Sequence, residues 1–162
     1  MATDAPDLSA SEDAAWRSMI VIWRQGFARL DRTFRRHGLI HLEYGILAVL
    51  SEAPNATMPA GELADLSGLS TSHLSHRLKV MEQRGDIVRA ASTTDRRMVS
   101  VALTSQGRTL LERVAPEHAA DVQSLMFEPL SASETRTLAT LLAKIAGPLS
   151  NHPFAAQPSR PK

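Results

Sequence analysis

Large apolar residues near the start of the chain recur at the spacing of a single helical stripe. They alternate in four- and three-residue steps over residues 11–36: Trp16, Ile20, Trp23, Phe27, Leu30 and Phe34. This spacing predicts one long amphipathic helix, with Ser11 as its N-cap and Gly38 after its last turn. One small domain rarely buries so many large apolar side chains of a single helix. We therefore expect part of the stripe to face a second copy of the chain. An ordinary core helix is the alternative.

Three shorter helices are predicted next, over Leu42–Ser51, Pro59–Leu66 and Ser70–Arg84. Gly68 marks a tight turn between the last two of them. The apolar positions of these two helices and their turn can share one small core: Leu63, Leu66, Leu69, Leu74, Leu78 and Met81. Two short helices joined by a tight turn are typical of a helix-turn-helix.

The apolar period then changes from helical to alternating. The segments Ile87–Ala91 and Met98–Leu103 predict two strands, which the polar loop Ser92–Arg97 joins into a β-hairpin. A hairpin that directly follows a helix-turn-helix is called a wing, and its tip lies at Asp95–Arg97.

Two more helices complete the pattern. The first is capped by Thr104 and runs to about Phe127, and Pro116 is expected to kink or interrupt it near Ala115 because proline removes a helical hydrogen bond. A capping box at Ser131–Glu134 begins the second. This last helix is expected to end at Gly147–Pro148 and to turn four apolar residues inward: Leu138, Leu141, Leu142 and Ile145.

The predicted fold class is α+β and mostly helical. A winged helix-turn-helix lobe spans residues 41–104, and N- and C-terminal helices over 11–37 and 105–146 form a dimerisation region within a single domain, 11–146. The ends, 1–10 and the proline-rich tail 147–162, bury too little apolar surface to offset the entropy of ordering, so we expect both to be disordered.

Charge is concentrated in one part of a nearly neutral chain. The chain carries a formal charge of +1, whereas residues 70–97 hold six basic and three acidic side chains. A local positive patch of this kind suits a protein that binds DNA selectively. The absence of cysteine excludes disulfides, thiolate metal sites and a cysteine nucleophile. Neither a signal peptide nor an apolar run near the ~18 residues of a membrane span is visible, so we expect a cytoplasmic protein without a membrane partner.

The polar face of the helix over 70–84 carries side chains that suit DNA. Ser70, Thr71 and Ser72 offer hydroxyls and free amides for phosphates at the helix N-terminus. An α-helix fits the major groove, where further polar residues can reach base edges: Ser72, His73, Ser75, His76, Arg77 and Lys79. The alternative is an ordinary capped surface helix with a solvated face.

The predicted wing strengthens the DNA interpretation. Arg96 and Arg97 at its tip can enter a narrow minor groove, whose negative potential attracts guanidinium groups. Asp95 is expected to orient a neighbouring arginine by a charge-assisted hydrogen bond, because phosphates would repel its carboxylate. A solvated loop with incidental charge is the alternative.

Over residues 15–146 the sequence resembles the MarR (multiple antibiotic resistance regulator) family. The segments that carry the resemblance are Glu62–Ala64, Leu69–Ser72, Gly85–Arg89, Asp95–Arg97 and Val101–Thr104 with Gly107. Arg97 matches the arginine of the family's Asp-x-Arg wing. At two positions the chain differs from the family pattern: Asp86 stands where an apolar residue is usual, and Arg77 is less apolar than expected.

The resemblance implies a homodimer joined by the first, fifth and sixth helices, bound to palindromic double-stranded DNA. It implies a sequence-specific transcription regulator, usually a repressor, which is released when a small ligand or an oxidant changes the spacing of the two recognition helices. The effector pocket of the family lies between the dimerisation helices and the DNA-binding lobe, where six residues are candidates to line it: Trp16, Trp23, Arg24, His41, Tyr44 and His118. A planar aromatic or phenolic acid could stack on Trp16 or Trp23 there. Packing of both tryptophans in a dimer stripe is the alternative.

Other classes of function find less support in the sequence. The pairs His73–His76 and His37–His41 have no carboxylate beside them in a ligand pattern, so we expect no metal. Phosphate-binding glycine loops, His-Glu-x-x-His and nucleophile elbows are absent, so we expect neither catalysis nor a cofactor beyond the effector. A winged helix that binds only proteins remains the alternative function.

Overall fold

The computed structural model describes residues 7–91 and 99–149. Its α-helices are α1 (Ala10–Val21), α2 (Phe27–Arg36), α3 (His41–Glu52), α4 (Ala60–Ser67), α5 (Thr71–Arg84), α6 (Ser105–Val122) and α7 (Ala132–Ala146). The strands are β1 (Thr57–Pro59), β2 (Ile87–Ala91) and β3 (Val99–Leu103). Two π-helical segments, η1 (Ile22–Gly26) and η3 (Gln123–Phe127), continue α1 and α6, and short 3₁₀ turns lie at Pro54–Ala56 and Gly147–Leu149. The mostly helical fold with a small antiparallel sheet is confirmed.

The N-terminal helix begins earlier than predicted and is not a uniform α-helix. Ser9, not Ser11, is its N-cap, because the Ser9 hydroxyl accepts the Glu12 amide and the Glu12 carboxylate accepts the Ser9 amide at 2.8 Å. The helix then widens into the π-helical segment η1, where Gly26 packs so closely on Leu125 of η3 that a Cβ would lie 2.9 Å from it. A π turn inserts one residue locally, which apolar spacing alone does not reveal.

The sheet contains a strand that the sequence pattern missed. β1 pairs antiparallel with β3, with Met58 opposite Val101, and the strand order is β1-β3-β2. Three residues are too few to show an alternating pattern. Pro59 ends β1 at a sheet edge, which tolerates proline, so the following helix starts at Ala60 rather than at Pro59.

The core lies in the half of the molecule that carries the helix-turn-helix. Leu74, Leu78 and Met81 of α5 are buried as predicted, together with Leu63 of α4. Leu66 and Leu69 pack against this core while only partly buried. The core also includes buried residues of α3 and of the inner face of the sheet. Packing against them fixes the position of α5.

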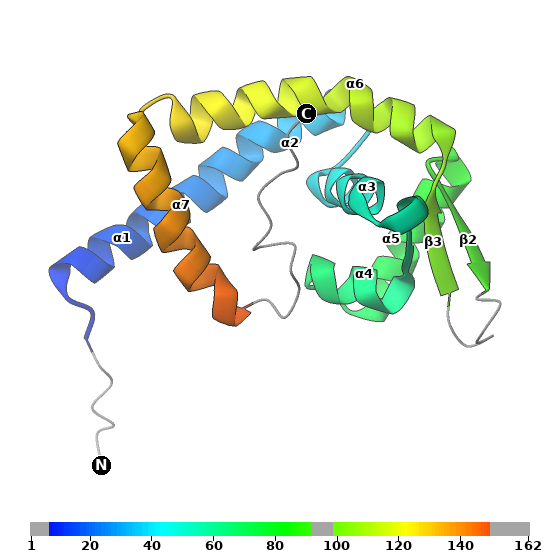
Figure 1. Ribbon diagram of the computed structural model, residues 1–162, viewed down its shortest axis with the longest axis horizontal. Helices are drawn as coiled ribbons and strands as arrows, with labels where there is room; N and C mark the ends of the chain where they lie inside the picture. The colour runs from blue at the N-terminus through cyan, green and yellow to red at the C-terminus, as the bar shows by residue number, and fades with distance from the viewer. Residues whose placement is uncertain (1–6, 92–98, 150–162) are drawn as a thin grey trace, which may run out of the picture.

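Helix α6 runs through Pro116 without interruption, so of the predicted kink or interruption near Ala115 the interruption is wrong. Figure 1 shows α6 along one side of the molecule, spanning from the sheet to the corner before α7. The buried side chains Leu110, Leu111 and Val114 hold the preceding turns against the core. This packing compensates for the hydrogen bond that Pro116 cannot donate.

Helix α7 begins with the predicted capping box, in which Ser131 and Glu134 satisfy each other's backbone amides. Its apolar stripe does not face inward within one chain, contrary to prediction. Leu138 is only half-buried, and Leu141, Leu142 and Ile145 are exposed, Ile145 by 53%. Figure 1 shows α1 and α7 at the end of the molecule away from the sheet. Among the described residues nothing covers this stripe, which explains the difference.

Candidate nucleic-acid interface

Helices α4 and α5 form a helix-turn-helix. Gly68 between them adopts the left-handed conformation, with φ of 61°, that glycine tolerates best. The Leu69 amide donates to the Ala64 carbonyl at 3.1 Å, which closes the turn. Strands β2 and β3 follow α5 directly and lie beside it (Figure 1).

The predicted DNA-contacting face of α5 is exposed. The Ser70 hydroxyl caps the helix by accepting the His73 amide at 3.4 Å, so this N–H is already paired. Six of the predicted side chains are exposed: Ser70, Thr71, Ser72, His73, Ser75 and His76. Lys79 is exposed as well, and Gln83 joins the stripe of Ser72, His76 and Lys79 at four- and three-residue steps. That spacing could have identified Gln83 from the sequence. The predicted DNA contacts stay predictions.

Arg77 lies apart from the other predicted contacts. Its side chain is 32% exposed, and its Nη1 donates to Oε1 of Glu43 on α3 at 3.4 Å. The Arg77 guanidinium is therefore engaged inside the chain, on the flank between the buried and the exposed stripes of α5.

Two more basic residues counted in the positive segment also pair within the chain. Arg84 contacts the carboxylates of Glu43 and Asp86, and Arg89 of β2 donates to Glu82 of α5 at 2.6 Å. Of the basic residues in 70–91, Lys79 is the one without an ion pair to another described residue. The free positive charge on this part of the surface is smaller than the composition suggested.

The predicted wing tip, Asp95, Arg96 and Arg97, lies outside the described residues. The strands that lead into and out of it are in register from Ile87 opposite Leu103 to Ala91 opposite Val99. Because the Arg89–Glu82 pair ties β2 to α5, the base of the wing is held beside the recognition helix.

The predicted effector residues separate into two groups. His41, Tyr44 and His118 come together around Phe34, which stacks on Tyr44 at 4.7 Å between ring centroids. The ring of His118 lies 4.6 Å from Tyr44, and that of His41 lies 5.3 Å from Phe34. This aromatic cluster lies between α2, α3 and α6. Trp16, Trp23 and Arg24 are instead exposed on α1 and η1, outside the cluster. Sequence reasoning missed Phe34 because its spacing assigned it to the helix stripe.

Both histidines of the aromatic cluster present an unsatisfied nitrogen. The Nδ1 atoms of His41 and His118 are buried and have no hydrogen-bond partner among the described residues. Desolvation lowers the pKa of His41, against an opposing effect of Asp31. Desolvation, followed by the proximity of His41, lowers the pKa of His118 against the opposing effect of Asp121. Two neutral imidazoles in an aromatic setting can hydrogen-bond a polar group of a small planar molecule.

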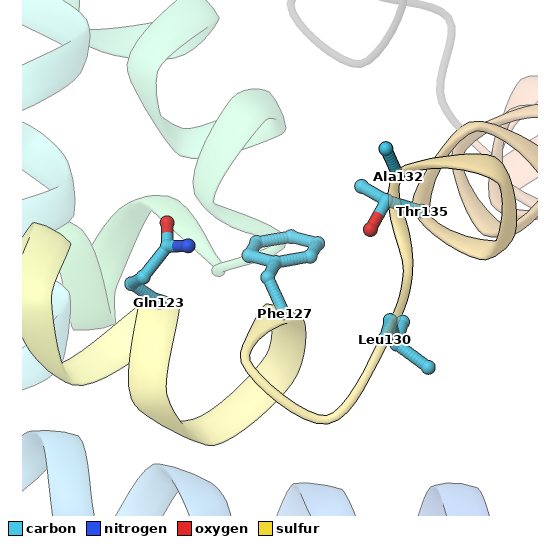
Figure 2. Close-up of a pocket in the computed structure, with 5 residues that line it drawn as sticks. All are labelled: Gln123, Phe127, Leu130, Ala132 and Thr135. Carbon is cyan, nitrogen blue, oxygen red and sulfur yellow. The ribbon is translucent and has the colours of Figure 1, made fainter.

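A separate pocket of about 420 Å³ lies where η3 turns into α7. Figure 2 shows the Phe127 ring between Gln123 and the start of α7, with Leu130, Ala132 and Thr135 completing the lining. None of the predicted effector residues lines it.

The described ranges, 7–91 and 99–149, bear on metal binding and on membrane insertion. No group of three or more histidine and acidic side chains there could hold a metal ion. No helix in the same ranges is long and apolar enough to cross a membrane.

A helix-turn-helix with an exposed polar second helix and an adjacent strand pair defines a winged-helix DNA-binding protein. A model of the MarR family matches residues 37–98. The chain is 33% identical over 125 residues to the transcriptional regulator PecS of Dickeya dadantii, covering 76% of this chain and 74% of PecS. The chain belongs to the MarR family.

Two solved MarR-family structures from Streptomyces coelicolor agree with this assignment. AbsC superposes with a TM-score of 0.83 at 30% identity, over 90% of this chain and 98% of AbsC. Sco3205, determined in complex with DNA, superposes with a TM-score of 0.83 at 31% identity, over 97% of this chain and 95% of Sco3205. The protein is thus a transcription regulator and not an enzyme, as the sequence predicted.

Proposed function

We propose that two copies of this chain bind palindromic duplex DNA and repress transcription in the cytoplasm until a small ligand releases them. The observation that carries the proposal is the exposed polar stripe on α5, opposite its buried stripe and beside the strands of the wing. In this arrangement α5 enters the major groove and the wing reaches the flanking minor groove.

Dimerisation is supported by apolar side chains that one chain leaves uncovered. On α1 and η1 these include Trp16, Met19 and Trp23, of which Trp23 is 64% exposed. The stripe of Leu141, Leu142 and Ile145 on α7 is the second component. Contiguous apolar patches of this kind mark protein interfaces, and a two-fold dimer would place two α5 helices about one helical turn of DNA apart (~34 Å).

The aromatic cluster supports an effector site. A planar aromatic or phenolic acid could lie against Phe34 and Tyr44 and hydrogen-bond the unpaired Nδ1 atoms of His41 and His118. The cluster sits between the helices of the dimerisation region and α3 of the DNA-binding lobe, so a ligand there could alter the spacing of the two α5 helices. Titration of the protein–DNA complex with candidate aromatic acids, following release of DNA, tests this part of the proposal, and DNA that stays bound at every acid concentration would contradict it.

The DNA-binding part is tested by selecting duplexes from a random pool with the wild-type protein. The expected result is a palindrome that binds more tightly than a scrambled duplex, with weaker binding by Arg96→Ala/Arg97→Ala protein. A winged helix that binds only proteins would select no palindrome and tolerate both substitutions.

A further inference from the structure

Glu43 is a buried carboxylate that joins α3 to the recognition helix. It lies in the first turn of α3, and only 2% of the residue is exposed. Its Oε2 accepts the Ile40 amide at 3.3 Å, while Oε1 faces Arg77. Both Arg84 Nη atoms donate to Oε2 at 3.2 Å. One carboxylate therefore contacts two arginines of α5.

The two arginines hold α5 at two points along its length. Arg84 follows Arg77 by seven positions, which places them on the same side of the helix, two turns apart. With a single polar contact, the buried stripe of α5 alone would restrain its rotation and tilt about that contact. Two contacts to one buried carboxylate restrict both motions.

Arg84 extends the contact to the end of the helix. Besides Glu43 it donates from Nε to Asp86, which is 1% exposed, and from Nη1 to the Gly38 carbonyl at 2.8 Å. The network of Glu43, Arg77, Arg84 and Asp86 contains two carboxylates and two guanidinium groups, so it is neutral as a whole. It explains why Asp86 and Arg77 can occupy positions where apolar residues were expected.

Only the two carboxylates of this network are buried, and both guanidinium groups are partly exposed. The pairing adds little to stability, because the desolvation of the carboxylates offsets most of the attraction. The role that we consider for these ion pairs is instead to select one arrangement of the packed helices. We propose that Glu43 is a positioning residue for DNA binding: it fixes the orientation of α5 on α3 through Arg77 and Arg84 and does not touch DNA itself. The inference rests on the proposed DNA-binding function.

The test compares wild-type, Glu43→Gln and Glu52→Gln proteins on the palindrome selected by the wild type. Glu52 ends the same helix and is exposed, so its substitution removes one negative charge without affecting α5. Circular dichroism and thermal unfolding establish that each variant is folded. Affinity is measured on the palindrome and on versions with one base pair inserted or deleted between the half-sites.

Glu43→Gln is expected to weaken binding to the palindrome by about tenfold while the protein stays folded. The difference in affinity between the palindrome and the duplexes with one base pair inserted or deleted should also become smaller. A less restrained α5 tolerates the displacement of ~3.4 Å that one base pair causes. Glu52→Gln should behave as wild type. A lower unfolding temperature with an unchanged spacing preference would indicate a purely structural role and would overturn the inference.

Two further results with Glu43→Gln protein would overturn the inference. The first is unchanged affinity and spacing preference for folded Glu43→Gln protein. The second is tighter binding with a steeper salt dependence, which would mean that Glu43 merely keeps Arg77 away from phosphates. If Glu43→Gln does not fold, Glu43→Asp replaces it, since the shorter side chain cannot reach both arginines, and wild-type behaviour of that variant would also overturn the inference. Failure of the wild type to select any palindrome would instead refute the proposed function.

Discussion

Gly107 lies so close to Asp86 that a Cβ on Gly107 would be 2.1 Å from the Asp86 carbonyl oxygen. The same corner holds Thr104, whose hydroxyl donates to the Gly85 and Asp86 carbonyls at 2.7 and 2.9 Å and accepts the Gly107 amide. The end of α5 and the start of α6 are thereby joined directly. The helix that is proposed to bind DNA is thus connected to α6, which leads to α7.

Gly107→Ala is expected to destabilise the fold by about 3 kcal/mol, because backbone must move to admit the methyl group. Gly61→Ala is the matched control, since nothing lies within 4 Å of a Cβ at that position in α4. There alanine should be neutral or stabilising by up to about 1 kcal/mol. Urea unfolding of the three proteins measures the difference, and equal stability of the two variants would contradict the close contact.

Ile145→Glu is expected to convert the proposed dimer into monomers, because it places a charge in the exposed apolar stripe of α7. Thr140→Glu adds the same charge on the opposite side of α7, where the side chain is exposed, and should leave the dimer intact. Sedimentation analysis at several concentrations separates the two outcomes. Dimeric Ile145→Glu protein would show that this stripe is not the interface.

The stability of the fold is expected to fall as the pH drops below the usual histidine pKa of 6.5. Burial lowers the pKa of His41 and His118 in the folded state, so the unfolded chain takes up protons that the folded chain does not. The free energy of unfolding therefore decreases from pH 6.5 downwards and levels off below the lowered pKa values.

Urea unfolding between pH 7.5 and pH 5.5 measures this dependence. His118→Gln should reduce the slope with pH, whereas His73→Gln, at an exposed position on α5, should not. If the free energy of unfolding of His118→Gln protein changes with pH as steeply as that of the wild type, the pH dependence does not come from His118.

Much of the fold follows from the sequence because its signals are local. Glycines at helix ends, the Ser131 capping box and the buried stripe of α5 lie within a few residues of the element that they define. The strand β1, the π-helical segments and the continuation of α6 through Pro116 depend on packing partners far away in the chain. Periodicity cannot report such partners.

The candidate site divides in the same way. Exposure of Ser72, His76 and Lys79 follows from their helical phase relative to Leu74 and Leu78. The hydrogen bond from Arg77 to Glu43 joins residues that are 34 positions apart, and no pattern in either segment predicts it. Counting charges along the chain therefore overstated the positive surface.

The most direct test of the account is the salt dependence of binding to the selected palindrome. If two copies together neutralise about eight phosphates, log affinity should fall against log salt with a slope of about −7. Lys79→Gln should make that slope shallower by about 2, one contact per subunit, and Lys144→Gln on α7 should leave it unchanged. Equal affinity for palindromic and scrambled duplexes, or a slope that Lys79→Gln does not alter, would contradict the placement of α5 on DNA.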